Sequence, residues 1–151
     1  NIDEKIFDNK EISKLSIFVE TAINNMGIES VLARCGNEYW EFHSGSALVR
    51  VFVFEKKYLY ATSPINVLPT GNLEKLLKYI LSNPIAPYQL ALNNNQIFVS
   101  YRVCISDIFS GNATTVQQNL SNLIVKADEM DDYFVQTFGC EKSNYAKKNR
   151  E

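Results

Sequence analysis

The sequence predicts an α+β domain in which helices pack on an antiparallel sheet, with the element order α-β-β-β-α-β-β-α. Three observations lead to this prediction. Three segments place apolar residues at helical spacing, several others alternate with a period of two, and short turn signals join neighbouring alternating segments. Strands joined by tight turns pair antiparallel, so the helices must supply the cover that such a sheet needs.

The first part of the chain predicts one helix and a meander of strands. The apolar residues of segment 11–25 fall on one helical face, and Gly27 follows where a C-cap glycine belongs. From residue 28 the period changes to two, and Glu55-Lys56 forms a tight charged turn. The expected meander of three strands spans residues 39–44, 47–54 and 57–63, and residues 28–34 are a candidate for a further short strand. A loop should follow at Pro64, Pro69 and Gly71.

The second part predicts a short helix, a hairpin and a long helix. Asn72 is the expected N-cap of a helix over residues 73–81. The apolar side chains of that helix are Leu73, Leu76, Leu77, Ile80 and Leu81. Strands at 88–92 and 96–105 should pair around Asn93-Asn94-Asn95, because asparagine tolerates the left-handed backbone of a tight turn. The last helix carries an apolar stripe from Val116 to Phe134 and ends at Gly139.

Length and charge fit one ordinary domain with its own core. The chain has 151 residues, of which 46% are hydrophobic and 21% charged, and its net charge is −2. A chain of this size buries roughly 70% of its unfolded surface. We therefore expect a single domain over residues 11–140, a polar lead-in at residues 1–10 and a disordered polar tail at residues 141–151.

Three stretches carry a resemblance to a known family. They are ALVRVFVFEKKYLYATSPI at 47–65, IAPYQLALNNNQIFVSYRV at 85–103 and LIVKADEMDDYF at 123–134. Together with the element order, they resemble the YbjN-like family of bacterial proteins, which shares its fold with type III secretion chaperones. The resemblance covers about residues 11–138. It implies a non-enzymatic module that dimerises and holds a partner polypeptide against its helix and sheet surfaces.

Few side chains in the sequence could form a reactive site. The only histidine, His43, shares a strand face with Glu41, and we expect it to be a half-exposed strand residue rather than a general base. The HSGS stretch at 43–46 lacks the spacing of a nucleophile elbow. No C-x-x-C motif is present, which predicts reduced thiols and a cytoplasmic location, with Cys140 exposed after the last helix. The other cysteines are Cys35 and Cys104.

Carboxylates gather on the last helix at Asp128, Glu129, Asp131 and Asp132. No EF-hand loop accompanies them, so they predict a solvated acidic face or a recognition surface for a basic partner rather than a metal site. No phosphate-binding loop, basic field or run of roughly 18 apolar residues is present. We therefore expect no catalytic residue, no metal or cofactor, no nucleic-acid partner and no membrane partner.

Two central strands are apolar on both faces. In 47–54, three valines alternate with a second set of large side chains that includes one arginine, and 96–105 repeats this pattern. A mid-strand arginine is costly to bury unpaired, so we place the arginine-bearing face outward. The predicted partner-binding residues on this face are Leu48, Arg50, Phe52, Phe54, Phe98 and Arg102.

Something should cover this face, because bare apolar area costs roughly 25 cal/mol per Å². We expect self-association, most simply a homodimer, or a bound client polypeptide, and the alternative is that the N-terminal helix or the tail folds across it. A rival function from another class is an enzyme or small-molecule sensor, with a pocket between sheet and helices near Tyr58, Tyr60 and Tyr101. A third hypothesis is a domain cut from a larger protein.

Overall fold

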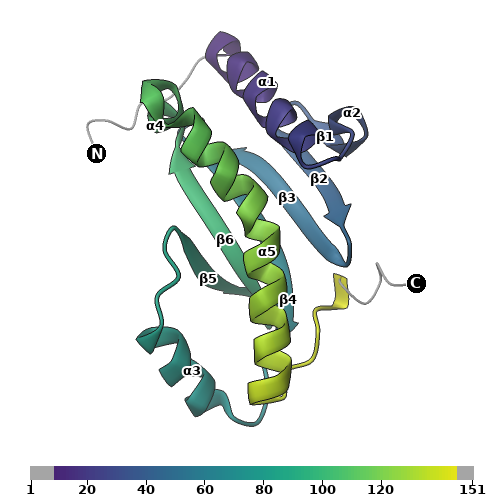
Figure 1. The fold of residues 1–151 in the computed structure, drawn as a ribbon, viewed down its shortest axis with the longest axis vertical. Coiled ribbons are helices and arrows are strands. Elements are labelled where there is room, and N and C mark those ends of the chain that lie inside the picture. The colour runs from purple at the N-terminus through teal and green to yellow at the C-terminus, as the bar shows by residue number, and fades with distance from the viewer. Residues whose placement is uncertain (1–8, 146–151) are drawn as a thin grey trace.

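A computed structural model describes residues 9–145 of the chain (Figure 1). Residues 1–8 and 146–151 lie outside the described residues, and with them most of the predicted lead-in and the end of the predicted tail. The helices are α1 (Asn9–Asn25), α2 (Ser30–Ala33), α3 (Leu73–Ser82), α4 (Ile105–Asp107) and α5 (Ala113–Phe138), and a kink at Ser110 and Gly111 separates the last two.

Six antiparallel strands form one sheet in the order β1-β2-β3-β4-β6-β5. They are β1 (Arg34–Gly36), β2 (Tyr39–Ser44), β3 (Ala47–Phe54), β4 (Tyr58–Val67), β5 (Tyr88–Asn93) and β6 (Gln96–Cys104). The predicted α+β class and antiparallel sheet are confirmed. Because α3 intervenes between β4 and β5, the second hairpin joins the sheet through β6 and leaves β5 at the edge.

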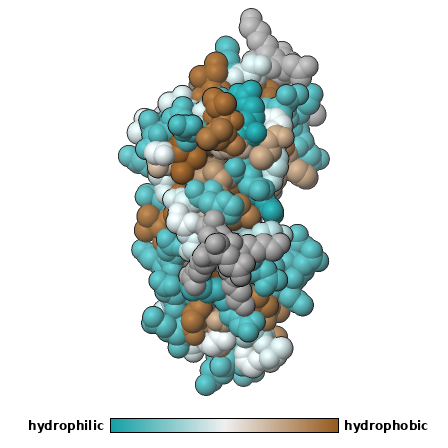
Figure 2. Space-filling model, turned by 90° about the vertical axis from the view of Figure 1, so that its right-hand side faces the viewer, coloured by the Kyte–Doolittle hydropathy of each residue, from teal (hydrophilic) through white to brown (hydrophobic). Residues whose placement is uncertain are grey.

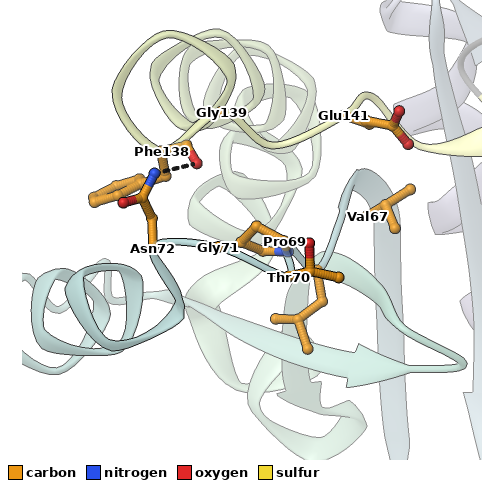
Figure 3. A pocket seen from close by; sticks show the side chains of 9 residues that line it. Val67, Pro69, Thr70, Gly71, Asn72, Phe138, Gly139 and Glu141 are labelled. Atoms are coloured by element: carbon orange, nitrogen blue, oxygen red, sulfur yellow. Dashed lines mark hydrogen bonds between the residues drawn. The ribbon is translucent and has the colours of Figure 1, made fainter.

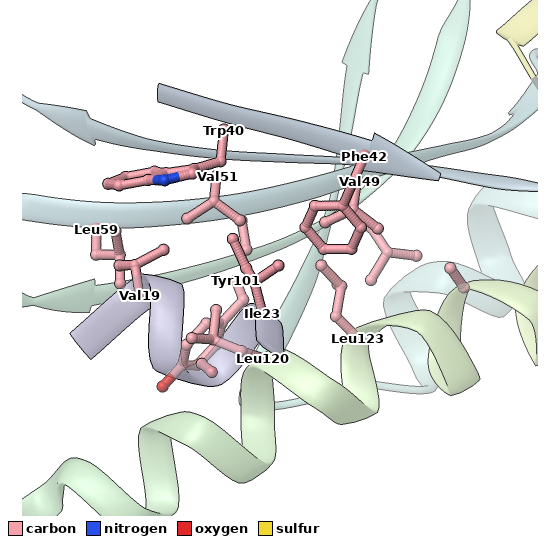
Figure 4. Packing of buried hydrophobic residues seen from close by; sticks show 14 of the residues in the cluster. Val19, Ile23, Trp40, Phe42, Val49, Val51, Leu59, Tyr101, Leu120 and Leu123 are labelled. Atoms are coloured by element: carbon pink, nitrogen blue, oxygen red, sulfur yellow. The ribbon is translucent and has the colours of Figure 1, made fainter. Parts of the chain in front are cut away.

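The two long helices, α1 and α5, pack on the same face of the sheet (Figures 1 and 4). Val19 and Ile23 of α1 and Leu120 and Leu123 of α5 meet side chains that point out of the strands. The strand residues of this core are Trp40, Phe42, Val49, Val51, Leu59 and Tyr101. We call the opposite face, which carries the alternate side chains of the same strands, the outer face.

The two predicted tight turns are present, and both use left-handed backbone. Asn94 and Asn95 have φ of 50° and 61°, and Glu55 and Lys56 have φ of 54° and 52°. Two consecutive left-handed residues match the twist of paired strands, and asparagine adopts this conformation at low cost. The turns fix the register of both hairpins, and thereby decide which side chains reach the outer face.

Two predicted boundaries are wrong in the region before β2 and at the end of β4. The expected strand at 28–34 is instead the single turn α2 followed by the short β1. The Ser30 amide donates to the Asn24 side chain, so local hydrogen bonds hold this segment in a helical turn. Pro64 was expected in a loop, but it lies inside β4 at a bulge, beyond the point where pairing with β3 stops at Thr62.

Two further predictions need correction, one at the start of α3 and one after α5. Asn72 precedes α3 but does not cap it: its backbone is left-handed, and its amide reaches the Phe138 carbonyl instead, at 3.3 Å. Residues 141–145, which we call the strap, are packed against the sheet rather than being a disordered tail. The Glu141 carbonyl accepts from Val67, and the Ser143 amide donates to Ile65. The C-cap role of Gly139 is confirmed by its φ of 69°.

Candidate partner-binding surfaces

Strand register places all six predicted partner-binding residues on the outer face. Across β3, Arg50 lies opposite Glu41 of β2, and Phe52 lies opposite Tyr60 of β4. On β6, Arg102 lies opposite Tyr60, and Phe98 lies opposite Pro64. The face therefore has two ends: one lies at the β3–β4 turn, and the other lies beside the strap.

The end at the β3–β4 turn carries an aromatic strip, which we define as Phe52, Phe54, Tyr58, Tyr60 and Arg102. The rings of Phe52 and Tyr60 stack at 5.4 Å with an interplanar angle of 6°, and Phe54 meets Tyr60 edge-on at 5.9 Å. The Arg102 guanidinium lies 4.6 Å from the centre of the Tyr58 ring. Phe54 is 47% exposed, so the strip presents large rings and a cation to solvent.

The other end of the face is closed by polar contacts and by the strap. Arg50 Nε donates to Glu41 Oε1 at 3.0 Å, and Tyr39 donates to the same oxygen at 2.7 Å. These two hydrogen bonds lower the pKa of Glu41, while burial and the same carboxylate raise the pKa of Tyr39 to about 12. The guanidinium of Arg50 also lies over the Tyr145 ring of the strap, at 4.9 Å.

The prediction of a bare outer face is wrong for Leu48. This side chain is only 3% exposed, although it does not belong to the core beneath the helices. The other five predicted residues are partly or fully exposed. The alternative that the tail folds across this face thus holds at the end beside Arg50 and Ser143, where the strap lies. Partner binding by the six residues stays a prediction.

A second surface lies on α3, where the fold buries only half of an apolar stripe. Leu76 is fully buried, and Tyr79 packs into an aromatic cluster on α5. Ile80 is half-buried against the core, but three leucines spaced four residues apart are exposed, and the last of them is 83% exposed. They are Leu73, Leu77 and Leu81. The sequence showed this excess, because five apolar residues are more than a ten-residue helix buries on one side.

A third surface lies around α1 and α2. Ile17, Val31 and Leu32 are all largely exposed, Val31 at 80%. A groove of about 530 Å³ runs from Ile12 to Glu38 beside them, next to the edge strand β1. In Figure 2 apolar atoms gather toward the top, which is the end of the molecule where α1 and α2 lie. Sequence reasoning missed this surface because it assigned 28–34 to a paired strand.

Comparison with solved structures identifies the fold. The chain is similar to the structure of the ExsC–ExsE complex, with a TM-score of 0.60, 12% identity, and coverage of 80% of this chain and 92% of that chain. It is also similar to the Yersinia pestis type III secretion chaperone SycH in complex with a stable fragment of YscM2, with a TM-score of 0.54 and 18% identity. That match covers 76% of this chain and 97% of SycH.

The fold is that of a type III secretion chaperone. This similarity confirms the fold that the sequence resemblance implies. The sequence itself matches no family model and no curated protein, so the resemblance to the YbjN-like family stays a prediction.

Within this secretion-chaperone fold, the tyrosines of the rival pocket do not converge. Tyr58 and Tyr60 lie on the outer face, whereas Tyr101 points into the helix-covered core and accepts from the Asn119 amide at 3.2 Å. A cavity of about 470 Å³ lies elsewhere, between the β4–α3 loop and the end of α5, and Figure 3 shows its lining residues. Among residues 9–145, no group of three potential metal ligands occurs.

The acidic cluster on α5 is exposed at Asp128, Glu129 and Asp132, as expected, but not at Asp131. Asp131 is only 7% exposed, accepting from Asn66 at 2.9 Å and pairing with Lys142 of the strap at 2.6 Å. Burial, followed by the charges of Asp132 and Asp131, raises the pKa of Asp128. Cys140, expected to be exposed, is buried beside this cluster.

In the part of the chain that the structure describes, no helix is both long and apolar enough to cross a membrane.

Proposed function

We propose that this chain is a non-catalytic, chaperone-like module that acts as a homodimer and holds a segment of a partner protein on the aromatic strip. The observation that carries the proposal is the coverage of the sheet by α1 and α5 on one face only, with stacked rings and an arginine exposed on the other. The names of the two similar structures support the binding of a partner protein, since each is a complex of two different proteins.

The chemistry of the strip favours a polypeptide over other ligands. Tyrosine, phenylalanine and arginine are the side chains that protein contacts use as anchors, because they bury much area and lose little conformational freedom. A small molecule needs a concave site with convergent polar groups, and the strip lies on the face of a sheet. A net charge of −2 supplies no general attraction for a nucleic acid.

The leucine stripe of α3 is the proposed contact with a second copy. Leu73, Leu77 and Leu81 lie on successive turns of one short helix, so a two-fold axis beside α3 would bring each stripe onto itself. The edge strand β5 lies on the same side of the molecule, as Figure 1 shows, and extends the area available to such a contact. Burying these leucines recovers roughly 25 cal/mol for each Å² removed from water.

Size-exclusion chromatography with light scattering tests the dimer on the full chain at micromolar concentration. We expect about twice the chain mass of 17.2 kDa for the natural sequence and the single chain mass for the double variant Leu77→Glu, Leu81→Glu. Lys78→Glu is the matched control, since Lys78 is an exposed neighbour on the same helix and its variant should stay dimeric. A monomeric natural chain, or loss of folded circular dichroism in the leucine variant, contradicts the proposal.

A peptide display library tests the aromatic strip. Segments enriched on the immobilised full chain should lose about tenfold in affinity on Phe54→Ser, Arg102→Ser, a loss of about 1.4 kcal/mol. The matched control is Ile17→Ser, Leu32→Ser, which removes two exposed apolar side chains near α1 and should leave binding unchanged. If the control variant loses binding and the strip variant keeps it, the groove beside α1 is the site and the strip is not.

A further inference from the structure

The strap is held to the sheet by a small set of contacts, nearly all of them polar. Its main chain makes two hydrogen bonds to β4: Val67 N–H to the Glu141 carbonyl at 2.9 Å and Ser143 N–H to the Ile65 carbonyl at 3.0 Å. Lys142 pairs with Asp131 at 2.6 Å and with Asp132 at 3.4 Å. Figure 1 shows the strap in yellow beside β4, after the end of α5.

The strap pairs with the part of β4 that extends beyond its pairing with β3. Pairing between β3 and β4 stops at Thr62, although β4 continues to Val67. Beyond that point the free edge of β4 takes the strap as its neighbour, with Lys142 in antiparallel register with Asn66. An unpaired edge is a template for any extended chain, and here the chain's own end occupies it.

Each strap side chain that faces the sheet meets a site with defined chemistry. Lys142 enters a negative site formed by Asp131 and Asp132. Ser143 is fully buried, so only a small side chain fits there. Tyr145 lies against the guanidinium of Arg50, which borders the aromatic strip two residues before Phe52. The order basic, small, any residue, aromatic therefore describes what this site accepts, with the aromatic side chain presented from the helical turn at residues 144–145.

We propose that the strap is a reversible occupant of a strand-docking site, and that the site takes a partner segment with the same order of side chains. The proposal rests on the proposed function, because the site is continuous with the aromatic strip through Arg50. A partner can then bind along the whole outer face only after the strap has left. A segment displaces the strap only if its binding free energy exceeds that of the strap, which requires side chains that match the site.

Amide hydrogen exchange followed by NMR tests reversibility on the full chain, with neighbouring amides as reporters. Val67 N–H depends on the strap, whereas Leu68 N–H donates to the Asn95 carbonyl in the β5–β6 turn. We expect Val67 to exchange about tenfold faster than Leu68 in the natural chain. The gap should widen about tenfold more in Lys142→Met, Tyr145→Leu, with Leu68 unchanged. Equal rates for the two amides in both proteins overturn the proposal.

A peptide in trans tests the chemistry of the site. The probe is a fluorescent peptide with the sequence of residues 141–151, EKSNYAKKNRE, and the control peptide has serine in place of the tyrosine. We expect the probe to bind the Lys142→Met, Tyr145→Leu protein about tenfold more tightly than the natural protein, and the control peptide to bind about tenfold more weakly than the probe. Lys78→Met, which breaks an exposed ion pair elsewhere, should bind as the natural protein does.

The results separate this inference from the proposed function. Equal binding of both peptides, or no gain in the strap variant, overturns the strap as an occupant of a docking site, even if library segments still depend on Phe54 and Arg102. Tighter binding of the probe peptide to the strap variant supports the inference if the control peptide, which lacks the tyrosine, does not show it. This conclusion holds even if library segments still bind after loss of Phe54 and Arg102, a result that would contradict the proposed function.

Discussion

Replacing Asp131 by alanine should destabilise the fold much more than replacing its neighbour Asp132. The Asp131 carboxylate joins α5 to β4 and to the strap, since Oδ1 accepts from Asn66 of β4 and Oδ2 pairs with Lys142 of the strap. The side chain of Asp132 is 69% exposed, and its distance to Lys142 is 3.4 Å. The two variants therefore remove the same group from opposite environments on one helix.

The magnitude follows from the contacts that each variant removes. A hydrogen bond to a charged group contributes about 1.5–3 kcal/mol, and Asp131→Ala removes two. Lys142 keeps Asp132 as a second partner, which lowers the cost, but Asn66 is fully buried and its amide keeps only the Glu141 carbonyl at 3.5 Å as an acceptor. We expect a loss of about 3 kcal/mol for Asp131→Ala. For the exposed pair of Asp132 we expect a loss below about 1 kcal/mol.

Chemical denaturation at neutral pH measures both losses in free energy of unfolding, provided that the slope against denaturant stays constant. A double-mutant cycle of Asp131→Ala with Lys142→Met should give a coupling of about 1 kcal/mol or more, because the two groups are in direct contact. A difference of less than about 1 kcal/mol between the two single variants would refute the assignment of Asp131 as a buried link between sheet, helix and strap.

Three smaller predictions concern single side chains. Glu20→Leu removes the acceptor of the buried Trp40 indole and should cost about 2 kcal/mol, visible in tryptophan fluorescence and denaturation. Although burial raises the pKa of Glu20, hydrogen bonds from Trp40 and Arg34 outweigh it and lower the pKa, so this stability is present above pH 4.5 and lost as the pH falls through the lowered value. Burial, followed by the charge of a neighbouring tyrosine, raises the pKa of Tyr88 to about 12, so stability should fall as the pH rises from 10 toward 12, and Tyr88→Phe should flatten that fall in thermal unfolding. Gly139→Ala should cost about 1 kcal/mol in thermal unfolding, through its φ of 69° alone, because no atom lies near an added Cβ.

Elements with a strong local pattern could be predicted from the sequence almost to the residue. The expected strands 39–44 and 47–54 have the bounds of β2 and β3, because alternation and a tight turn act within each hairpin. The end of α5 at Gly139 followed from its left-handed C-cap. For the same reason, the strands could be divided correctly into a core face and an outer face.

Features that depend on distant partners could not be predicted. The strap has the composition of a solvated tail, and nothing local in EKSNY indicates that Ser143 is fully buried or that Lys142 meets Asp131. The interpretation of the acidic cluster on α5 as solvated was wrong at Asp131 for the same reason, because the partners of Asp131 come from β4 and the strap. The prediction of a strand at residues 28–34 was wrong for a different reason, because the helical turn there is held by the Asn24 side chain, six residues before Ser30.

The two ends of the outer face are held by different kinds of contact, aromatic rings at the strip and an ion pair at the strap. At the aromatic strip, exposed rings contact other rings, and such contacts are insensitive to charge. At the strap, a buried carboxylate and a lysine carry the attachment, and a buried ion pair adds little net stability while its geometry fixes one arrangement. Another cation can compete for the carboxylates of such an attachment, whereas it could not compete with a leucine buried at the same place. The strap is therefore built to hold one position without holding it strongly, which is the property that an exchangeable occupant of a binding face requires.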